Sequence, residues 1–131
     1  MGRREISRGE CLDRLAQAKV GRVVFVRGAL PEIVPVCYLV AGESVVFGLN
    51  SSSPVAQELE GSVVVFQVDS FDPERESGWH VRAVGTLDPS LAPDELAVAG
   101  IVVPPPWTIG EAPERILKID LEVVGGYVVE A

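Results

Sequence analysis

Short apolar runs rich in valine recur along most of the chain, separated by glycine, proline and acidic residues. Runs of this length between turn residues are typical of β-strands. The connections at 42–43, 72–78 and 125–126 have the composition of tight or polar turns. The pattern therefore predicts strands joined mostly as hairpins, at residues 22–27, 32–41, 44–50, 62–71, 79–89 and 115–124, with a last short strand at 127–130.

One amphipathic segment before these strands has a helical period. Ser7 and Glu10 fit a capping box, and Ile6 and Cys11 fit a hydrophobic staple. We therefore predict a helix over 7–18, whose narrow apolar face is made by Leu12, Leu15 and Ala16.

Two later segments, 54–60 and 92–101, have weaker helical character, and the proline-rich stretch 103–107 excludes regular structure beyond a polyproline turn. Helices do not alternate with strands, which argues against a doubly wound nucleotide-binding fold. Consecutive hairpins favour closure into a barrel. We predict a mainly β protein, an antiparallel barrel of six to seven strands with two or three short helices, folded as a single domain over 1–131.

A proline, Pro35, lies inside the predicted strand 32–41. Proline has no amide hydrogen to donate to a neighbouring strand. The sequence therefore predicts an edge, a bulge or a ligand-facing gap at this position.

The formal net charge is −8 and hydrophobic residues make up 47% of the chain. An acidic chain repels polyphosphate, so nucleic acid and anionic membranes are poor partners. The N-terminus lacks the apolar stretch of a signal peptide, and Cys11 and Cys37 are best interpreted as reduced thiols, so we expect a cytoplasmic protein. The high apolar content suggests apolar surface that a partner subunit covers.

Classical catalytic and metal-binding patterns are absent from the sequence. The single histidine, His80, lies in a predicted strand, where a structural or solvated role is commoner than catalysis. Asp69, Asp72 and Glu74 crowd one turn but lack the spacing of a calcium loop. We therefore expect no metal site and assign no catalytic residue.

The stretch "GLNSSSPVAQELEG" (48–61) is the best candidate for ligand binding. Ser53 is a good helix N-cap and Pro54 a good first helical residue. A helix start attracts phosphate through its free amides, but the same residues could simply cap a connecting helix. Four aromatic residues leave a similar choice between flanking a planar ligand and filling the core: Tyr38, Phe47, Trp79 and Trp107.

Several segments together resemble a known family: "CLDRLAQAKVGRVVFV", "EIVPVCYLVAGESVVFGL", the serine-bearing helix start, "VVVFQVDSFDPERESGWHVRAVGTL" and a late Pro-Trp. In this order they resemble the pyridoxamine 5′-phosphate oxidase-like, FMN-binding split-barrel proteins, in particular their small bacterial branch. The resemblance covers about residues 10–124.

This resemblance implies a split β-barrel, a homodimer, and FMN bound in a groove between the subunits. It implies that one strand lies along the flavin through Pro35, Val36, Cys37 and Tyr38. It places the ribityl phosphate at Phe47, Gly48, Leu49, Asn50 and Ser53, and it places Trp79 at the border of the groove.

The chain departs from the family at the basic phosphate clamp. Where family members have Arg or Thr, and then Lys, this chain has Gly48, Leu49 and Pro54. Weak FMN binding, a deazaflavin, a tetrapyrrole and no cofactor all remain open. Two functions follow: an FMN-dependent oxidoreductase acting on a small planar molecule, or a degenerate barrel that serves as a binding or interaction module.

Overall fold

A computed structural model of the chain describes residues 2–49, 61–88 and 115–131. The predicted mainly β, antiparallel architecture is confirmed. Its elements are β1 (Gly2–Glu5), α1 (Arg8–Gln17), β2 (Val20–Arg27), β3 (Leu30–Ala41), β4 (Ser44–Leu49), β5 (Val63–Asp72), β6 (Ser77–Asp88) and β7 (Arg115–Glu130).

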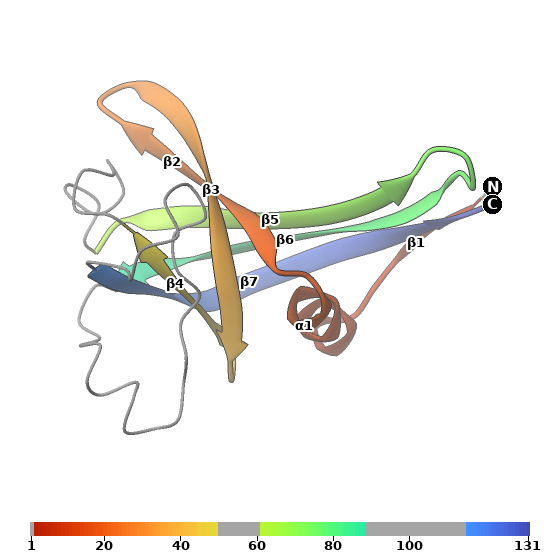
Figure 1. Ribbon diagram of the computed structural model, residues 1–131, viewed down its shortest axis with the longest axis horizontal. Coiled ribbons are helices and arrows are strands. Elements are labelled where there is room, and N and C mark those ends of the chain that lie inside the picture. The colour runs from red at the N-terminus through yellow and green to blue at the C-terminus, as the bar shows by residue number, and fades with distance from the viewer. Residues whose placement is uncertain (1, 50–60, 89–114) are drawn as a thin grey trace.

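The strands form one sheet that closes into a ring. Their order is β1-β7-β4-β3-β2-β5-β6, and a further pairing of β6 with β7 joins the two ends of the six-stranded part. The strands β5, β6 and β7 run on beyond the ring together with β1, and the β2–β3 hairpin projects away from it (Figure 1). This arrangement is a split barrel, as the resemblance implies.

The core fills the ring and continues under α1. Its fully buried side chains come from strands all around the barrel and from the helix, and include Leu15, Val23, Phe47, Phe66, Ala83, Leu87, Leu117 and Ile119. Burying an aliphatic or aromatic side chain of this size stabilises the fold by about 1.5–3 kcal/mol.

Helix α1 begins where the sequence predicts. Ser7 is its N-cap, and the Ser7 hydroxyl accepts a hydrogen bond from the Glu10 amide at 3.2 Å. The Glu10 carboxylate lies 3.5 Å from Arg4 Nη1 of β1. Ile6 and Cys11 both belong to the core, as the predicted staple requires.

Strand β7 corrects one prediction, because Gly125 and Gly126 do not form a turn. They continue the strand, opposite Arg82 and Val81 of β6. A Cβ on Gly126 would collide with the carbonyl oxygen of His80 and would lie 3.2 Å from Cys11 Sγ. The glycines therefore allow β6, β7 and α1 to approach closely. Glycine within a strand can mark such a contact as well as a turn.

Pro35 lies at an open edge, which confirms one of the three expectations. Strand β4 pairs with β3 only from Tyr38 to Ala41, whereas β2 pairs with β3 from Leu30 to Cys37. Within the described ranges, Pro35 therefore faces no strand on its second side.

Strand β1 was missed, because its sequence, GRRE, is charged and all four residues are exposed. The predicted helices 54–60 and 92–101, the stretch 103–107 and Trp107 lie outside the described residues. No helix within the described ranges is long and apolar enough to cross a membrane.

Candidate functional site

The outer face of the sheet carries apolar side chains in a line across five strands. Directly paired residues lie on the same face, and the register connects each residue to the next. Ile33 and Val123, at the two ends, are 63% and 68% exposed, and the three between them are half-buried. We call this line the apolar row: Ile33, Val24, Val65, Val84 and Val123.

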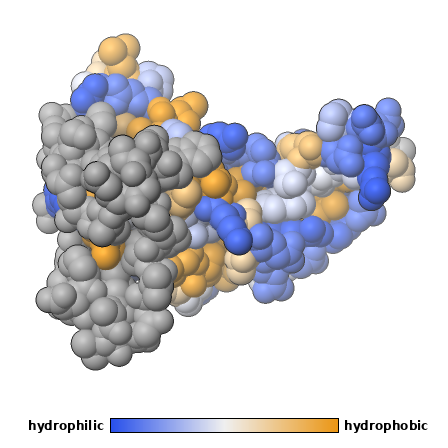
Figure 2. Space-filling view, in the orientation of Figure 1, coloured by the Kyte–Doolittle hydropathy of each residue, from blue (hydrophilic) through white to orange (hydrophobic). Residues whose placement is uncertain are grey.

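A hollow of about 430 Å³ lies between β2 and the start of β5, beside the apolar row. Val26 and Val63, which line it, are 62% and 68% exposed. Hydrophobic residues reach the surface at the β2–β3 hairpin, whereas the extended end of the long strands is largely hydrophilic (Figure 2). This part of the outer face is therefore far more apolar than a solvated sheet face usually is.

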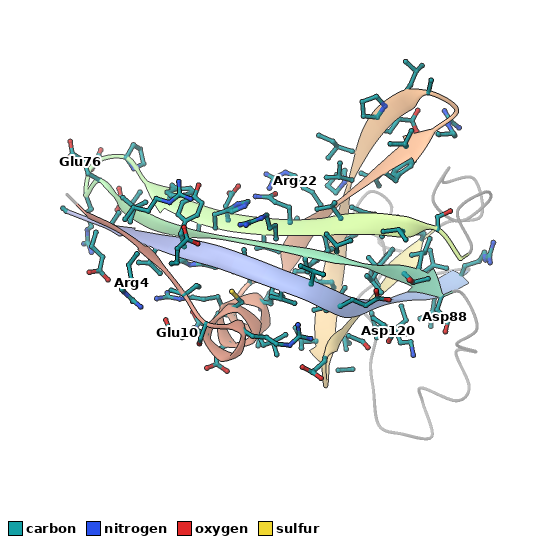
Figure 3. All side chains as sticks on the ribbon, turned by 180° about the vertical axis from the view of Figure 1, so that it is seen from behind. Arg4, Glu10, Arg22, Glu76, Asp88 and Asp120 are labelled. Atoms are coloured by element: carbon teal, nitrogen blue, oxygen red, sulfur yellow. The ribbon has the colours of Figure 1, made fainter. Side chains whose placement is uncertain are left out.

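A second line of paired residues runs beside the apolar row, two residues along each strand. It contains two arginines, Arg22 and Arg82, on either side of Gln67. Arg22 and Glu10 lie on opposite sides of the long strands (Figure 3), so this line faces away from α1. We call it the polar row: Pro35, Arg22, Gln67, Arg82 and Gly125.

A third line contains His80, which lies between Asp69 and Tyr127. The Gln67 side chain links the second and third lines, because its Oε1 accepts from Arg22 Nη1 at 3.2 Å. Its Nε2 donates to Asp69 Oδ2 at 2.6 Å and lies 3.1 Å from His80 Nδ1. Since Gln67 Nε2 can only donate, His80 Nδ1 accepts, and the His80 proton is on Nε2.

His80 is held neutral by its surroundings. Burial lowers its pKa from the usual 6.5, Arg82 lowers it further, and Asp69 opposes the shift. Its ring stacks at a tilt on Tyr127, with centroids 5.2 Å apart, and the Arg3 guanidinium covers Tyr127 at 3.9 Å. His80 therefore presents an N–H donor at the outer face without carrying a charge.

The residues predicted along the flavin divide between the two faces of β3. Pro35 is exposed and belongs to the polar row, and Cys37 is half-buried on the same face. Val36 and Tyr38 are each 3% exposed and point into the core. Of these four residues, only Pro35 and Cys37 offer side chains to a ligand on the outer face.

The Tyr38 side chain belongs to the core. Its hydroxyl donates a 2.5 Å hydrogen bond to the Leu15 carbonyl, which lies in the last turn of α1, and its ring meets Phe66 edge-on at 4.9 Å. Burial raises the pKa of Tyr38 to about 12. Tyr38 thus satisfies a carbonyl that the helix itself leaves unpaired.

The residues predicted at the phosphate are also buried where the structure describes them. Phe47 and Leu49 are core residues, and Gly48 is buried opposite Ile116 of β7. Asn50 and Ser53 lie outside the described residues. The role of these positions in binding stays a prediction.

Trp79 lies on the helix side of β6, away from His80. The Arg14 guanidinium is 6.0 Å from the centre of its ring, and both line a hollow of about 340 Å³ near the β5–β6 turn. Its predicted position at the groove between subunits stays a prediction.

The sequence did not indicate that Arg22, Gln67 and Arg82 share one line. Only strand register brings β2 beside β5 and β6. Cys11 and Cys37 are free thiols, and burial raises the pKa of Cys11. No group of three potential metal ligands gathers anywhere in the described part of the chain.

Comparison with protein families gives a match to the pyridoxamine 5′-phosphate oxidase model over residues 7–126. The chain is also 32% identical over 127 residues to an uncharacterised protein of Mycobacterium tuberculosis, covering 93% of this chain and 82% of that protein.

Solved structures share the fold at lower identity. An FAD-binding protein of Mesorhizobium loti superposes with a TM-score of 0.78 at 22% identity, covering 100% of this chain and 99% of that one. An FAD-binding protein of Mycobacterium smegmatis gives 0.75 at 18%, covering 97% and 98%. An FAD and heme binding protein of the same organism gives 0.72 at 15%, covering 98% and 74%.

Proposed function

Because this chain belongs to the pyridoxamine 5′-phosphate oxidase family, we propose that it binds a flavin on the outer face of its split barrel. The observation that carries the proposal is the pairing of an apolar row with a polar row on that face. The FAD-binding proteins that share the fold support a flavin as the ligand.

The outer face matches the chemistry of a flavin in two respects. The apolar row offers a flat surface to a planar ring, and Arg82 and the Nε2–H of His80 offer donors to the polar part of the ligand. Pro35 and Cys37, which the resemblance places along the flavin, lie on the same face. FMN is the form that the resemblance indicates.

A bound flavin supplies the redox chemistry, which suits an oxidoreductase acting on a small planar molecule. The protein would then hold the ring, orient it and exclude water. His80 is not arranged as a free base, because its Nδ1 is occupied by Gln67.

A second copy of this chain is the partner that we propose for the apolar row. Exposed apolar side chains that gather on one face, as Val26, Ile33, Val63 and Val123 do here, are typical of an interaction site. The hollow between β2 and β5 continues this surface. A homodimer closed through this face would leave the polar row at its border, where a ligand could contact both subunits.

Among the alternative ligands, a tetrapyrrole with iron bound by His80 is the least favoured. Haem-ligating histidines coordinate iron through a deprotonated ring nitrogen. The Gln67 contact places the proton on Nε2 and occupies Nδ1. His80 is therefore arranged as a hydrogen-bond donor. The free thiols support a reducing, cytoplasmic location.

The test is to add FMN, FAD or riboflavin to the purified protein, remove the excess by gel filtration, and record the absorption spectrum. We expect a flavin to be retained in proportion to protomer concentration. A colourless protein after all three additions would contradict the proposal and favour a cofactor-free binding module.

A further inference from the structure

Arg82 differs from most of the arginines that the structure describes. Arg3, Arg4, Arg8, Arg22, Arg27 and Arg75 each lie within 4 Å of a carboxylate oxygen. Arg82 is exposed and has no such partner within the described ranges. In a chain of net charge −8, an arginine left without an acidic neighbour is available to an external anion.

Gly125 makes room for the Arg82 side chain. A Cβ on Gly125 would lie 3.3 Å from Arg82 Nη2 and 3.5 Å from its Cζ, so the guanidinium lies directly over the bare glycine. The guanidinium therefore lies against the sheet over Gly125. A Cβ at this position would crowd the guanidinium, so the glycine keeps this place open to it.

The neighbours of Arg82 add a donor and a second positive charge. His80 lies two residues before Arg82 on the same face and offers Nε2–H. Arg22 lies across Gln67, about 10 Å from Arg82 between backbones, which is two strand spacings. The negative charge of Asp69 offsets part of this positive charge, since its carboxylate lies 3.9 Å from Arg22 Nη1.

We propose that Arg82 of the polar row and His80 of the third line beside it form an anion-binding site, and that this site takes the phosphate of the flavin. The identity of the anion rests on the proposed function, whereas the site itself rests on Arg82, Gly125 and His80. This site would supply the positive charge that the chain lacks at Gly48, Leu49 and Pro54.

The first experiment uses inorganic phosphate and needs no flavin. His80 is the only histidine, so its ring signals in the proton NMR spectrum are unambiguous. We expect phosphate to shift these signals saturably in the wild type. Arg82→Ala should weaken this binding by about tenfold to a hundredfold, the range for a hydrogen bond to a charged group.

Three further variants make this test specific. Arg75→Ala removes the same charge at the β5–β6 turn, where the Arg75 side chain is 84% exposed, and should leave phosphate binding unchanged. Arg82→Lys should keep part of the phosphate binding that Arg82→Ala loses. Asp69→Asn should strengthen it, because it removes the carboxylate of the cluster. Absence of a saturable shift in the wild type, or equal losses in Arg82→Ala and Arg75→Ala, would overturn the proposal.

The second experiment compares FMN with riboflavin, which lacks the phosphate. We expect Arg82→Ala to weaken the binding of FMN by at least tenfold and to change the binding of riboflavin by no more than about twofold. Equal effects on both ligands, or none on either, would overturn the assignment to the flavin phosphate. If the wild type binds phosphate at Arg82 but no flavin, the proposed function fails while the anion site stands.

Discussion

Both faces of the sheet carry apolar side chains at neighbouring positions of the same strands, but the described chain fully buries only the inner face. On the inner face, Val23, Phe66 and Ala83 are 0% exposed. One residue along each strand, on the outer face, lies the apolar row, whose end residues are more than 60% exposed. A sheet with one solvated face normally alternates apolar with polar residues. The loss of that alternation here is the basis for proposing that a second subunit covers the outer face.

The largest effect on the fold is expected from an inner-face substitution, Phe66→Ala. Phe66 packs against Tyr38, and loss of the Phe66 ring leaves a cavity that the surrounding strands cannot close. We expect the free energy of unfolding, measured with denaturant, to fall by about 3–5 kcal/mol. Val63→Ala on the same strand is the matched control, since Val63 is 68% exposed, and it should change stability by about 0.5 kcal/mol or less. Similar losses in both variants would remove the distinction between the faces.

Tyr38→Phe tests whether an inner-face residue also serves the ligand. The substitution leaves the Leu15 carbonyl without its donor, so stability should fall by about 1–3 kcal/mol while flavin retention is unchanged. The folded-state pKa of about 12 lies above the ordinary 10. This contribution is therefore complete below about pH 10 and is lost as pH rises through about 12.

Unfolding measured against pH in Tyr38→Phe and in Tyr127→Phe, whose ring lies on the outer face, separates the two roles. Unchanged stability combined with lost flavin binding in Tyr38→Phe would place Tyr38 at the ligand, as the resemblance implies.

Local sequence predicted those parts of the fold that depend on local chemistry. The strand runs, the Ser7 cap and the open edge at Pro35 each follow from a few neighbouring residues. The two glycines of β7 were misread, because a turn and a close strand contact require the same residue. Only tertiary structure separates these two uses.

The candidate site depends on strand register, which the sequence does not state. Arg22 lies on the same face as His80 and Arg82 only because β2 pairs with β5. Similarly, the resemblance selected β3 as the strand along the flavin, while the pleat decides that Pro35 faces outward and Val36 inward.

Val123→Asp tests the outer face at an exposed position. We expect the stability of the protomer to change by about 0.5 kcal/mol or less, because Val123 is 68% exposed. The dimer should dissociate, since the substitution places a charge in each copy of an apolar interface. Sedimentation at micromolar concentration measures this, with Ala16→Asp as the control. Ala16 was predicted on the apolar face of α1, but the structure shows it exposed. A wild-type monomer, or a Val123→Asp dimer as tight as the control, would contradict the proposed interface.

The smallest effect is expected from His80→Gln, in the pH dependence of stability. The charged or titratable groups around His80 are Asp69 of β5, Arg82 of β6, Tyr127 of β7 and Arg3 of β1. Because its folded pKa lies below 6.5, the unfolded chain takes up the proton first as pH falls. Stability should therefore decrease from about pH 7 downward, through the lowered folded pKa.

His80→Gln should remove that slope, and Asp69→Asn should steepen it, because Asp69 is the group that raises the pKa. Denaturant unfolding at a series of pH values gives both slopes. If His80→Gln keeps the wild-type slope, another group titrates in this range, and the neutral His80 donor of the outer face loses its support. If the slope disappears, His80 is neutral at neutral pH and the positive charge of the anion site comes from arginine alone, which is the state that an anionic ligand would select.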